Sequence, residues 1–566
     1  MAKKLVNTRN HNRDYFVFSL IPVAFAVLGF IHWQNVNRKL GEKNHQNESS
    51  GPPIDYSLLD KSICLFKTQY CEAPEKYRRL VDCFHSEDIK VYYLKNQSSC
   101  VDCMLTPGFL FPTDAEDTSK IVKCLANTVP RVPFRVRSGA HSFSGTSFIQ
   151  EGFIVDMKRL GRISVKPKKK EVTVGVGNRV GEIYKALEKH NLLMIGGDCP
   201  DVGIGGLSST GGTGFTTRKY GILINSILNY QIVLATGEIV NASYTENRDL
   251  FDVLRGGGAS SFGILTQVTM KLAPLEPQYG LIRIKIDKKG MGEWIKYFLS
   301  ISKTFSEDVM YLYTYLFADI VMIQGAITGD SFASESKQRD LIQELIGKAR
   351  NRSITIIDGN VYKIPYTDLY KYTYGKESFV KATSPKSTWM RDFRQEENSK
   401  SVGIMSGYIC TDDIPLEVFE HLEEHYYNPE YRAHLEHSDL GTNIELFGGK
   451  EFPDEAHGIY AGKGCNGIVT TYPKFTNNMW KNDLIQRYLT GFWNILRPYT
   501  NYSYRGYEDL SNGRTDQRGH VGLMDLHFAD KKYQAMEAKT KYDPMNVFKN
   551  QISIPTLDCY EKNICL

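Results

Sequence analysis

Two glycine-rich stretches of this chain carry side chains that could do covalent chemistry. Residues 196–206, GGDCPDVGIGG, hold Cys199, and residues 135–145, RVRSGAHSFSG, hold His141. A backbone with few Cβ atoms lets a flat or anionic ligand come very close. The two stretches therefore predict one ligand site with a thiol and an imidazole beside the ligand.

Further glycines follow in residues 211–214 (GGTG) and 255–258 (RGGG). No GxGxxG segment opens a helix after a strand with an acidic partner about twenty residues on, so a Rossmann fingerprint is excluded. Successive backbone N–H groups in glycine loops offer another way to hold a pyrophosphate. We expect that second arrangement here.

Length and charge restrict the class of protein. At 566 residues the chain is too long for one compact core, so two or more domains are expected. The net charge of +5 is small for this size. The basic run 168–170 separates two alternating strand patterns and predicts a solvated hairpin turn. Nothing in this balance requires a nucleic-acid partner.

Residues 15–33, YFVFSLIPVAFAVLGFIHW, contain no charge and are long enough to cross a bilayer as one helix. The flanking Lys and Arg residues favour a cytosolic N-terminus. We therefore expect a cytosolic tail (1–14), a transmembrane signal-anchor (15–33), a flexible stalk (34–54) and a catalytic part that is lumenal or extracellular. The alternative is a cleaved signal peptide, since Ala24-Phe25-Ala26 offers small residues at the cleavage spacing, and a secreted protein.

Cysteine usage agrees with an oxidising compartment. Of eleven cysteines, ten remain when Cys199 is set aside as a ligand, an even number suited to disulfides. Six crowd the segment after the stalk: Cys64, Cys71, Cys83, Cys100, Cys103 and Cys124. Cys559 and Cys565 could close a C-terminal loop, and Cys100-x-x-Cys103 could instead be a redox dithiol or half a zinc site. No second pair completes a zinc site, so structural disulfides are expected and no metal. Glycosylation sequons begin at Asn47, Asn96, Asn241, Asn351 and Asn501.

The elements that must position His141 and Cys199 are short strands with single helices. Residues 114–126 and 180–190 predict helices, and Gly237-Glu238 predicts a hairpin between two strands. Strands mixed with single helices indicate an α+β fold rather than a repeating βαβ array.

Four ordered motifs resemble one family. They are RVRSGAHSFSG, GGDCPDVGIGGLSSTGGTGF, LFDVLRGGGASSFGILTQVTMKL and KYDPMNVFKNQISIP. Together they are similar to the berberine bridge enzyme-like branch of the vanillyl-alcohol oxidase superfamily, which has a PCMH-type FAD-binding fold. The resemblance covers roughly residues 75–275 and 490–555. It implies an FAD-binding domain in residues 55–275 that is completed by residues 496–566.

The resemblance also implies a cofactor, FAD, attached covalently through His141 and Cys199. Arg137, Ser138, Gly139, Ala140 and Ser142 would then belong to the first flavin loop. The second loop would contain Pro200, Val202, Gly203, Gly205, Gly206, Gly211, Gly212 and Gly214, and Asn546 and Gln551 match the closing motif. In this family, valine at the position of Val202 is associated with oxidases, and the position of Ala140 is usually a glycine. Two electron-withdrawing attachments raise the flavin potential and prevent cofactor loss, which suits difficult oxidations.

Residues 276–495 are expected to form the substrate-binding domain, an antiparallel sheet with helices on one side and its free face above the flavin. Relatives carry a glutamine or glutamate with a lysine on a strand after a Gly-Gly segment. Here that strand reads GIVTTYPKF and offers Thr470, Thr471 and Tyr472, so the familiar base is missing. The Tyr-x-Asn-Tyr motif of the family can be read as Tyr499 to Tyr502 or as Tyr504 to Tyr507.

We expect Tyr507 to face the substrate as a phenolate with its pKa lowered by Arg505, with Tyr504 and Tyr472 as further catalytic candidates beside Val202. The sequence thus predicts a membrane-anchored FAD-dependent oxidase that removes hydride from an alcohol, sugar or amine carbon and passes electrons to O2. Two alternatives remain. One is a flavin dehydrogenase with another acceptor, and the other is a catalytically inactive surface flavoprotein that acts as a binding or structural module.

Overall fold

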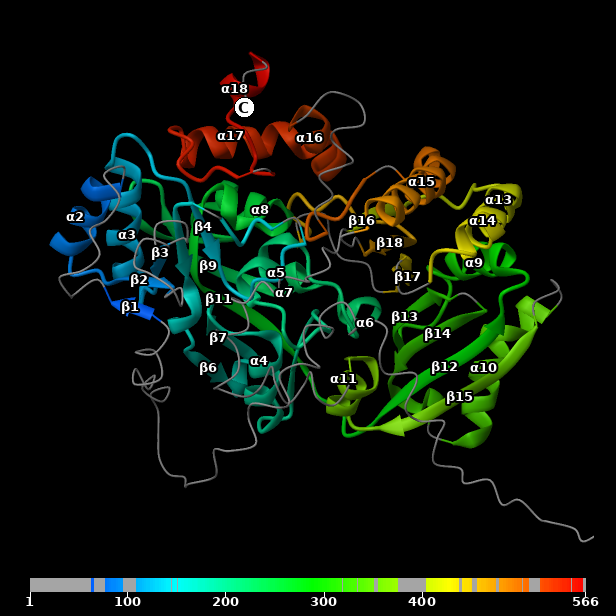
Figure 1. The fold of residues 1–566 in the computed structure, drawn as a ribbon. Helices are drawn as coiled ribbons and strands as arrows, with labels where there is room; N and C mark the ends of the chain where they lie inside the picture. The colour runs from blue at the N-terminus through cyan, green and yellow to red at the C-terminus, as the bar shows by residue number, and fades with distance from the viewer. Residues whose placement is uncertain are drawn as a thin grey trace, which may run out of the picture.

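The computed structural model contains three β-sheets in two parts (Figure 1). It describes residues 63–65, 77–94, 108–143, 145–149, 151–317, 319–332, 334–350, 355–374, 404–436, 440–449, 456–474, 478–500, 502–507, 520–550 and 552–562. Two sheets form the first part, and a seven-stranded sheet with its helices forms the second (Figure 1). The α+β fold expected from the sequence is confirmed.

The first sheet leads into the loop that carries His141. Its strands are β1 (Ile63–Leu65), β2 (Val91–Leu94), β3 (Gly108–Leu110), β4 (Phe134–Arg137) and β5 (Phe153–Asp156), in the order β1-β2-β3-β5-β4. Helix α3 (Ala115–Asn127) begins at Asp114, whose side chain accepts a hydrogen bond from the Asp117 amide. This N-cap explains why the helix begins where the sequence predicts it.

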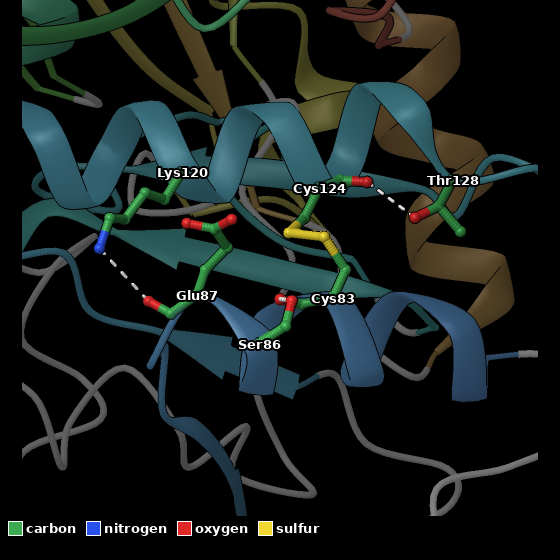
Figure 2. Close-up of a disulfide and its surroundings, with 6 residues drawn as sticks. All are labelled: Cys83, Ser86, Glu87, Lys120, Cys124 and Thr128. Atoms are coloured by element: carbon green, nitrogen blue, oxygen red, sulfur yellow. Dashed lines mark hydrogen bonds between the residues drawn. A yellow bond between two sulfur atoms is a disulfide. The ribbon is translucent and has the colours of Figure 1, made fainter.

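A disulfide joins helix α2 (Arg78–Ser86) to α3 through Cys83 and Cys124 (Figure 2). Beside it, the Thr128 hydroxyl donates to the Cys124 carbonyl at 2.7 Å, and Lys120 donates to the Glu87 carbonyl at 3.4 Å. The prediction of structural disulfides among the crowded cysteines is thus confirmed for this pair.

Two further observations concern the other cysteines. Cys410 is bonded to Cys465, and Cys559 is also disulfide-bonded. Among the described residues Cys199 is the free cysteine, as its predicted role as a ligand requires.

Replacing both Cys83 and Cys124 with Ser is expected to lower the free energy of unfolding by about 2–4 kcal/mol, because the bond constrains the unfolded chain. The two cysteines are 41 residues apart, a separation long enough for a sizeable entropic effect. Urea unfolding followed by tryptophan fluorescence would measure the change, with the exposed Ser336→Ala variant as control. Equal midpoints for the double variant and the parent would contradict the prediction.

The second sheet supports the loop that carries Cys199. Its order is β10-β9-β11-β7-β6, with β8 (Leu192–Met194) pairing β11. The strands are β6 (Ile163–Lys166), β7 (Glu171–Gly175), β9 (Ile227–Leu234), β10 (Ile239–Ser243) and β11 (Gly263–Pro274). The predicted hairpins at residues 168–170 and 237–238 are both present, as β6–β7 and β9–β10. The predicted helix over 180–190 is α4 (Val180–Glu188).

The third sheet is antiparallel throughout, with the order β15-β12-β14-β13-β17-β18-β16. Its strands are β12 (Tyr279–Asp287), β13 (Val309–Leu316), β14 (Ile320–Ile327), β15 (Ile356–Ile364), β16 (Met405–Ile409), β17 (Leu440–Leu446) and β18 (Gly467–Pro473). Helices α9 (Met291–Ser300), α10 (Glu335–Arg350), α13 (Leu416–Tyr426) and α15 (Met479–Leu496) share one hydrophobic core with it. Because successive residues of a strand point to opposite faces, every second side chain lies on the face of the sheet without these helices.

Arg218 joins the two parts. It lies on α6 (Thr217–Tyr220) and is fully buried. Its guanidinium donates to the carbonyls of Val309 at 3.0 Å, Ser302 at 2.7 Å and Phe305 at 2.8 Å, all of the second part. Arginine suits this position because its fork of donors can satisfy several carbonyls at once.

The C-terminal helices α16 (His520–Phe528) and α17 (Lys532–Tyr542) return over the first part (Figure 1). There Lys539 is fully buried and donates to Asp543 at 2.6 Å and to the Ser261 carbonyl at 2.7 Å. The KYDPMNVF motif therefore acts by fastening the end of the chain to the first part.

In the ranges given above, no helix is long and apolar enough to cross a membrane. The predicted anchor (15–33) and stalk (34–54) lie outside the described residues. So do Cys100 and Cys103 and every predicted sequon asparagine except Asn241, which is exposed on β10.

Candidate active site

A cavity of about 680 Å³ lies where the two glycine loops meet the seven-stranded sheet and the chain that returns from it. From the first loop it is lined by Ser138, Gly139, Ala140, His141 and Ser142. From the second loop it is lined by Cys199, Val202, Gly203, Gly205 and Gly206. His141 and Cys199, far apart in the sequence, thus face one cavity as predicted.

The close approach of the two loops explains part of their glycine content. A Cβ on Gly139 would lie 2.1 Å from the amide nitrogen of Gly203, so a side chain is sterically excluded there. Backbone contact between the loops brings the imidazole and the thiol to the same cavity.

Ala140 has a φ of 58°, in the left-handed region that an L-residue adopts at a cost of about 1–2 kcal/mol. The family's usual glycine at this position has a direct physical reason, because glycine adopts this conformation without strain. The alanine keeps the loop conformation and still lines the cavity.

Arg137 is not part of the cavity wall. Its guanidinium is buried and donates from Nε to Asp156 at 2.7 Å, and the two side chains are 3% and 4% exposed. The residue therefore anchors the end of β4 to β5, and its expected contact with the cofactor is replaced by a supporting role.

Several residues of the second motif also shape the loop from behind. The Pro200 carbonyl accepts a hydrogen bond from the Gly181 amide at 2.9 Å. A Cβ on Gly214 would lie 2.7 Å from the Gly197 carbonyl carbon. The Gly212 amide donates to the Tyr504 hydroxyl at 2.9 Å, and a Cβ on Gly211 would lie 2.7 Å from the Tyr504 ring.

Of the closing motif, Asn546 has a φ of 50° and does not line the cavity. Gln551 lies outside the described residues. Tyr504, expected as a catalytic candidate, lines the cavity but uses its hydroxyl to hold the second loop.

The Cys199 thiol is partly exposed to the cavity. Burial raises the pKa of Cys199, and the nearby carboxylates of Asp201 and Asp198 raise it further. At neutral pH the sulfur therefore keeps its proton until a base removes it.

Tyr472 and Tyr507 form an aromatic wall with Phe143. The Tyr472 and Tyr507 ring centroids are 6.3 Å apart, and each lies within 6.4 Å of the Phe143 centroid. All three residues line the cavity. The wall suits a small molecule with an apolar face and hydroxyl or amine groups at its edge.

The predicted phenolate at Tyr507 is wrong. Burial raises the pKa of Tyr507 well above its usual range, and Tyr472, Glu445 and Asp198 raise it further. The Arg505 guanidinium lies 5.4 Å from the Phe528 ring centroid and donates to the Ile552 carbonyl. Tyr507 is therefore a neutral hydrogen-bonding group at neutral pH.

Sequence reasoning missed the acid of this site, Glu445. Glu445 lies on β17, is 5% exposed and lines the cavity. Its Oε2 accepts a hydrogen bond from the Thr213 hydroxyl at 3.3 Å, while its buried Oε1 has no partner among the described residues. Burial and Asp198 raise the pKa of Glu445 well above that of an ordinary carboxyl. Carboxylates in such surroundings are frequent general bases.

A signal for Glu445 was present in the sequence. Gly441, Asn443 and Glu445 alternate along one strand just before Gly448 and line the cavity, whereas the base of the relatives is expected on the strand that follows. On that later strand, Tyr472 lines the cavity, but the Thr471 hydroxyl accepts a hydrogen bond from the Trp493 indole on the helical side.

The residues present fit FAD. His141 and Cys199 supply the two attachment atoms that the resemblance requires, and the glycine loops leave room for a flat ring system. Gly206 lines the cavity and has nothing within 4 Å of the position of an added Cβ, so the space beside its backbone is open to a ligand.

Comparisons with known proteins agree with this assignment. Residues 106–243 match the model of the FAD binding domain. FAD-dependent monooxygenase CTB5 of Cercospora beticola is 32% identical over 205 residues, 35% of this chain and 38% of the relative. FAD-linked oxidoreductase pytB of Aspergillus terreus is 32% identical over 166 residues, 29% of this chain and 20% of the relative. The chain thus matches well under half the length of these curated relatives.

Solved structures share the fold over most of both chains. Berberine bridge enzyme from Eschscholzia californica superimposes with a TM-score of 0.69 at 19% identity, covering 84% of this chain and 99% of that one. Chitooligosaccharide oxidase superimposes with a TM-score of 0.71 at 19% identity, with the same coverage.

Residues 106–243 thus form an FAD binding domain, and the curated relatives that share this region are named as FAD-dependent or FAD-linked enzymes. The resemblance read from the four motifs is therefore supported for the FAD binding domain of residues 106–243 and for the fold, which is that of berberine bridge enzyme.

Proposed function

We propose that the protein is an FAD-dependent oxidase, bicovalently linked through His141 and Cys199. It would transfer hydride from an alcohol, carbohydrate or amine carbon to the flavin and pass the electrons to O2, giving H2O2. One observation carries the proposal. A buried carboxylate with an unpartnered oxygen, Glu445, lines the same cavity as His141 and Cys199.

FAD, when bound, supplies the two-electron acceptor for the hydride. Glu445 accepts the proton of the substrate hydroxyl or ammonium through its free Oε1, while Thr213 holds Oε2. Tyr507 and Tyr472 donate hydrogen bonds that orient the substrate, and the aromatic wall excludes water from the carboxylate.

The polar and aromatic side chains of the cavity wall support this substrate class, and so do the names of the solved structures that share the fold. Those relatives are described as a reticuline dehydrogenase variant of berberine bridge enzyme and as a chitooligosaccharide oxidase. Both names denote small-molecule substrates. An uncharged or cationic molecule of this type suits a cavity end made of phenols and the carboxylates of Glu445 and Asp198.

Two alternatives differ in their outcome. A dehydrogenase would use the same site with an acceptor other than O2, and Val202 at the cavity wall favours the oxidase. The absence of the family's usual base suggested a catalytically inactive binding module. Glu445 offers a base at this cavity, so it favours an enzyme over the binding module.

Peroxide release on a panel of sugars, aromatic and aliphatic alcohols, and amines tests the proposal. Peroxide formed in proportion to consumed O2 would support the oxidase. Anaerobic bleaching of the flavin without peroxide in air would replace it with the dehydrogenase. No bleaching with any compound, in protein that carries flavin, would favour the binding module.

Replacing Tyr507 with Phe is expected to slow flavin reduction about tenfold, the effect of losing one hydrogen bond to an uncharged group. Anaerobic stopped-flow with a compound from the panel measures the rate, and Tyr533→Phe at the surface is the control. A loss of a hundredfold or more would make Tyr507 the base after all.

We also propose that residues 15–33 anchor the protein with its catalytic part lumenal or extracellular and glycosylated. The disulfides at Cys83–Cys124 and Cys410–Cys465 support an oxidising compartment. Carbonate extraction of membranes is expected to leave the protein in the pellet, and glycosidase treatment is expected to increase its mobility on a gel. Release into the supernatant at the size of a cleaved chain would indicate secretion instead.

A further inference from the structure

Three buried oxygens at the cavity wall and close to it make no hydrogen bond of regular geometry among the described residues. They are Oε1 of Glu445 and the hydroxyls of Tyr408 and Tyr460. The three residues are 5%, 1% and 8% exposed. Leaving buried polar atoms unsatisfied destabilises a fold, so a group of them calls for an explanation beyond packing.

The register of the sheet places Tyr408 and Glu445 on one face. Tyr408 of β16 pairs directly with Ile468 of β18, and Ile468 pairs directly with Glu445 of β17. Directly opposed residues of antiparallel strands point to the same side of the sheet. The Tyr408 phenol and the Glu445 carboxyl therefore lie on one face of the sheet, on either side of Ile468. The charge of Glu445 is among the causes that raise the pKa of Tyr408, after burial and the influence of Tyr460 and Tyr504.

The phenols continue from Tyr408 toward a partly exposed hydroxyl, that of Thr210. The ring centroids of Tyr408 and Tyr460 are 5.7 Å apart, and those of Tyr460 and Tyr504 are 6.2 Å apart. Burial raises the pKa of Tyr504 to about 12, while hydrogen bonds from the Gly212 amide and Thr210 lower it. Thr210 is partly exposed.

We propose that Tyr408, Tyr460 and Tyr504 form a relay that carries the proton of Glu445 to Thr210 and solvent. The relay rests on the proposed function, since Glu445 must lose its proton between turnovers. The O–H bond of Glu445 breaks and its proton moves to a phenol oxygen. Each phenol passes its own proton to the next oxygen, and the last proton leaves from Thr210. The carboxylate is restored, one proton is released and no electron moves.

Tyr408→Phe and Tyr460→Phe test the relay in the substrate-free, full-length protein. Each change removes one uncharged buried hydroxyl and leaves no charge without a partner, so the free energy of unfolding should change little. The readout is hydrogen–deuterium exchange at the Glu445 carboxyl, followed through its infrared C=O band in D2O. The band is identified as the one missing from Glu445→Gln.

Exchange at Glu445 is expected to slow at least about tenfold in Tyr408→Phe and in Tyr460→Phe. Tyr488→Phe is the matched control, because Tyr488 is fully buried, its hydroxyl is likewise unpartnered, and it lies in the helical core of the second part. This control should exchange at the parent rate.

Equal exchange rates in all variants would overturn the relay, as would the absence of a Glu445 carboxyl band in the parent at every pH. Slow exchange in the two variants, together with no flavin reduction of the parent protein on the substrate panel, would support the relay and contradict the proposed oxidase. Slowing in Tyr488→Phe as well would show a general loosening of the fold and overturn the assignment to these phenols.

Discussion

Replacing Glu445 with Gln is expected to slow flavin reduction by about 10²–10⁴-fold, the usual contribution of a general base. The amide keeps the size of the side chain and can still interact with Thr213, but it cannot accept a proton from the substrate. The rate is measured by anaerobic stopped-flow with a compound that reduces the parent protein. A rate within a factor of a few of the parent would remove Glu445 from the mechanism.

Glu420→Gln is the matched control, because Glu420 lies exposed on α13 away from the cavity. It should leave the rate unchanged. The absorption spectrum of the oxidised flavin should also be the same in both variants, which shows that the site still holds its cofactor.

The surroundings of Glu445 determine whether the rate of flavin reduction rises or falls with pH. Burial and the charge of Asp198 raise its pKa, and the hydrogen bond from Thr213 opposes them. Only the ionised carboxylate acts as a base, so the rate should rise with pH through a pKa higher than that of an ordinary glutamate. Replacing Asp198 with Asn should move this rise to lower pH. A rate that falls with pH in that range would contradict the assignment.

The combined replacement His141→Ala with Cys199→Ala is expected to abolish covalent flavin attachment. Both side chains line the cavity, and Cys199 is the free cysteine of the described residues. Acid precipitation of the parent should leave a yellow protein pellet, and the double variant should give a colourless pellet. Mass spectrometry should show loss of one FAD mass.

Each single variant is expected to keep one attachment and a yellow pellet. Cys83→Ser with Cys124→Ser serves as a control for cysteine replacement, because that pair lies at the junction of α2 and α3. Covalent flavin in the double variant would place an attachment elsewhere, and a colourless parent would remove bicovalent attachment from the proposal.

Sequence reasoning succeeded where the signal is local. The hairpins at residues 168–170 and 237–238 follow from turn residues between alternating strands, and α3 follows from the apolar spacing of Ile121, Val122 and Leu125. The glycine loops around His141 and Cys199 were recognised because a close backbone approach demands glycine, and Gly139 against Gly203 shows that demand directly.

The contact that Arg137 makes depends on a distant segment rather than on its own motif. Its position in the first motif suggested a ligand contact, but its partner, Asp156, comes from a neighbouring strand. A contact of this kind depends on strand pairing, which a motif does not reveal.

The sequence by itself indicated FAD as the cofactor and the two loops whose His141 and Cys199 face one cavity, because these features reside in short motifs with fixed spacing. The tertiary structure decided the acid–base chemistry. Glu445 becomes a base candidate only when β17 is placed over the glycine loops and its carboxyl is buried. Tyr507 keeps its proton because folding buries it and surrounds it with the phenols and carboxylates of distant segments, which raise its pKa further. The protonation of Glu445 and Tyr507 depends on burial and on charges that folding brings together, and the spacing of residues along the chain predicts neither.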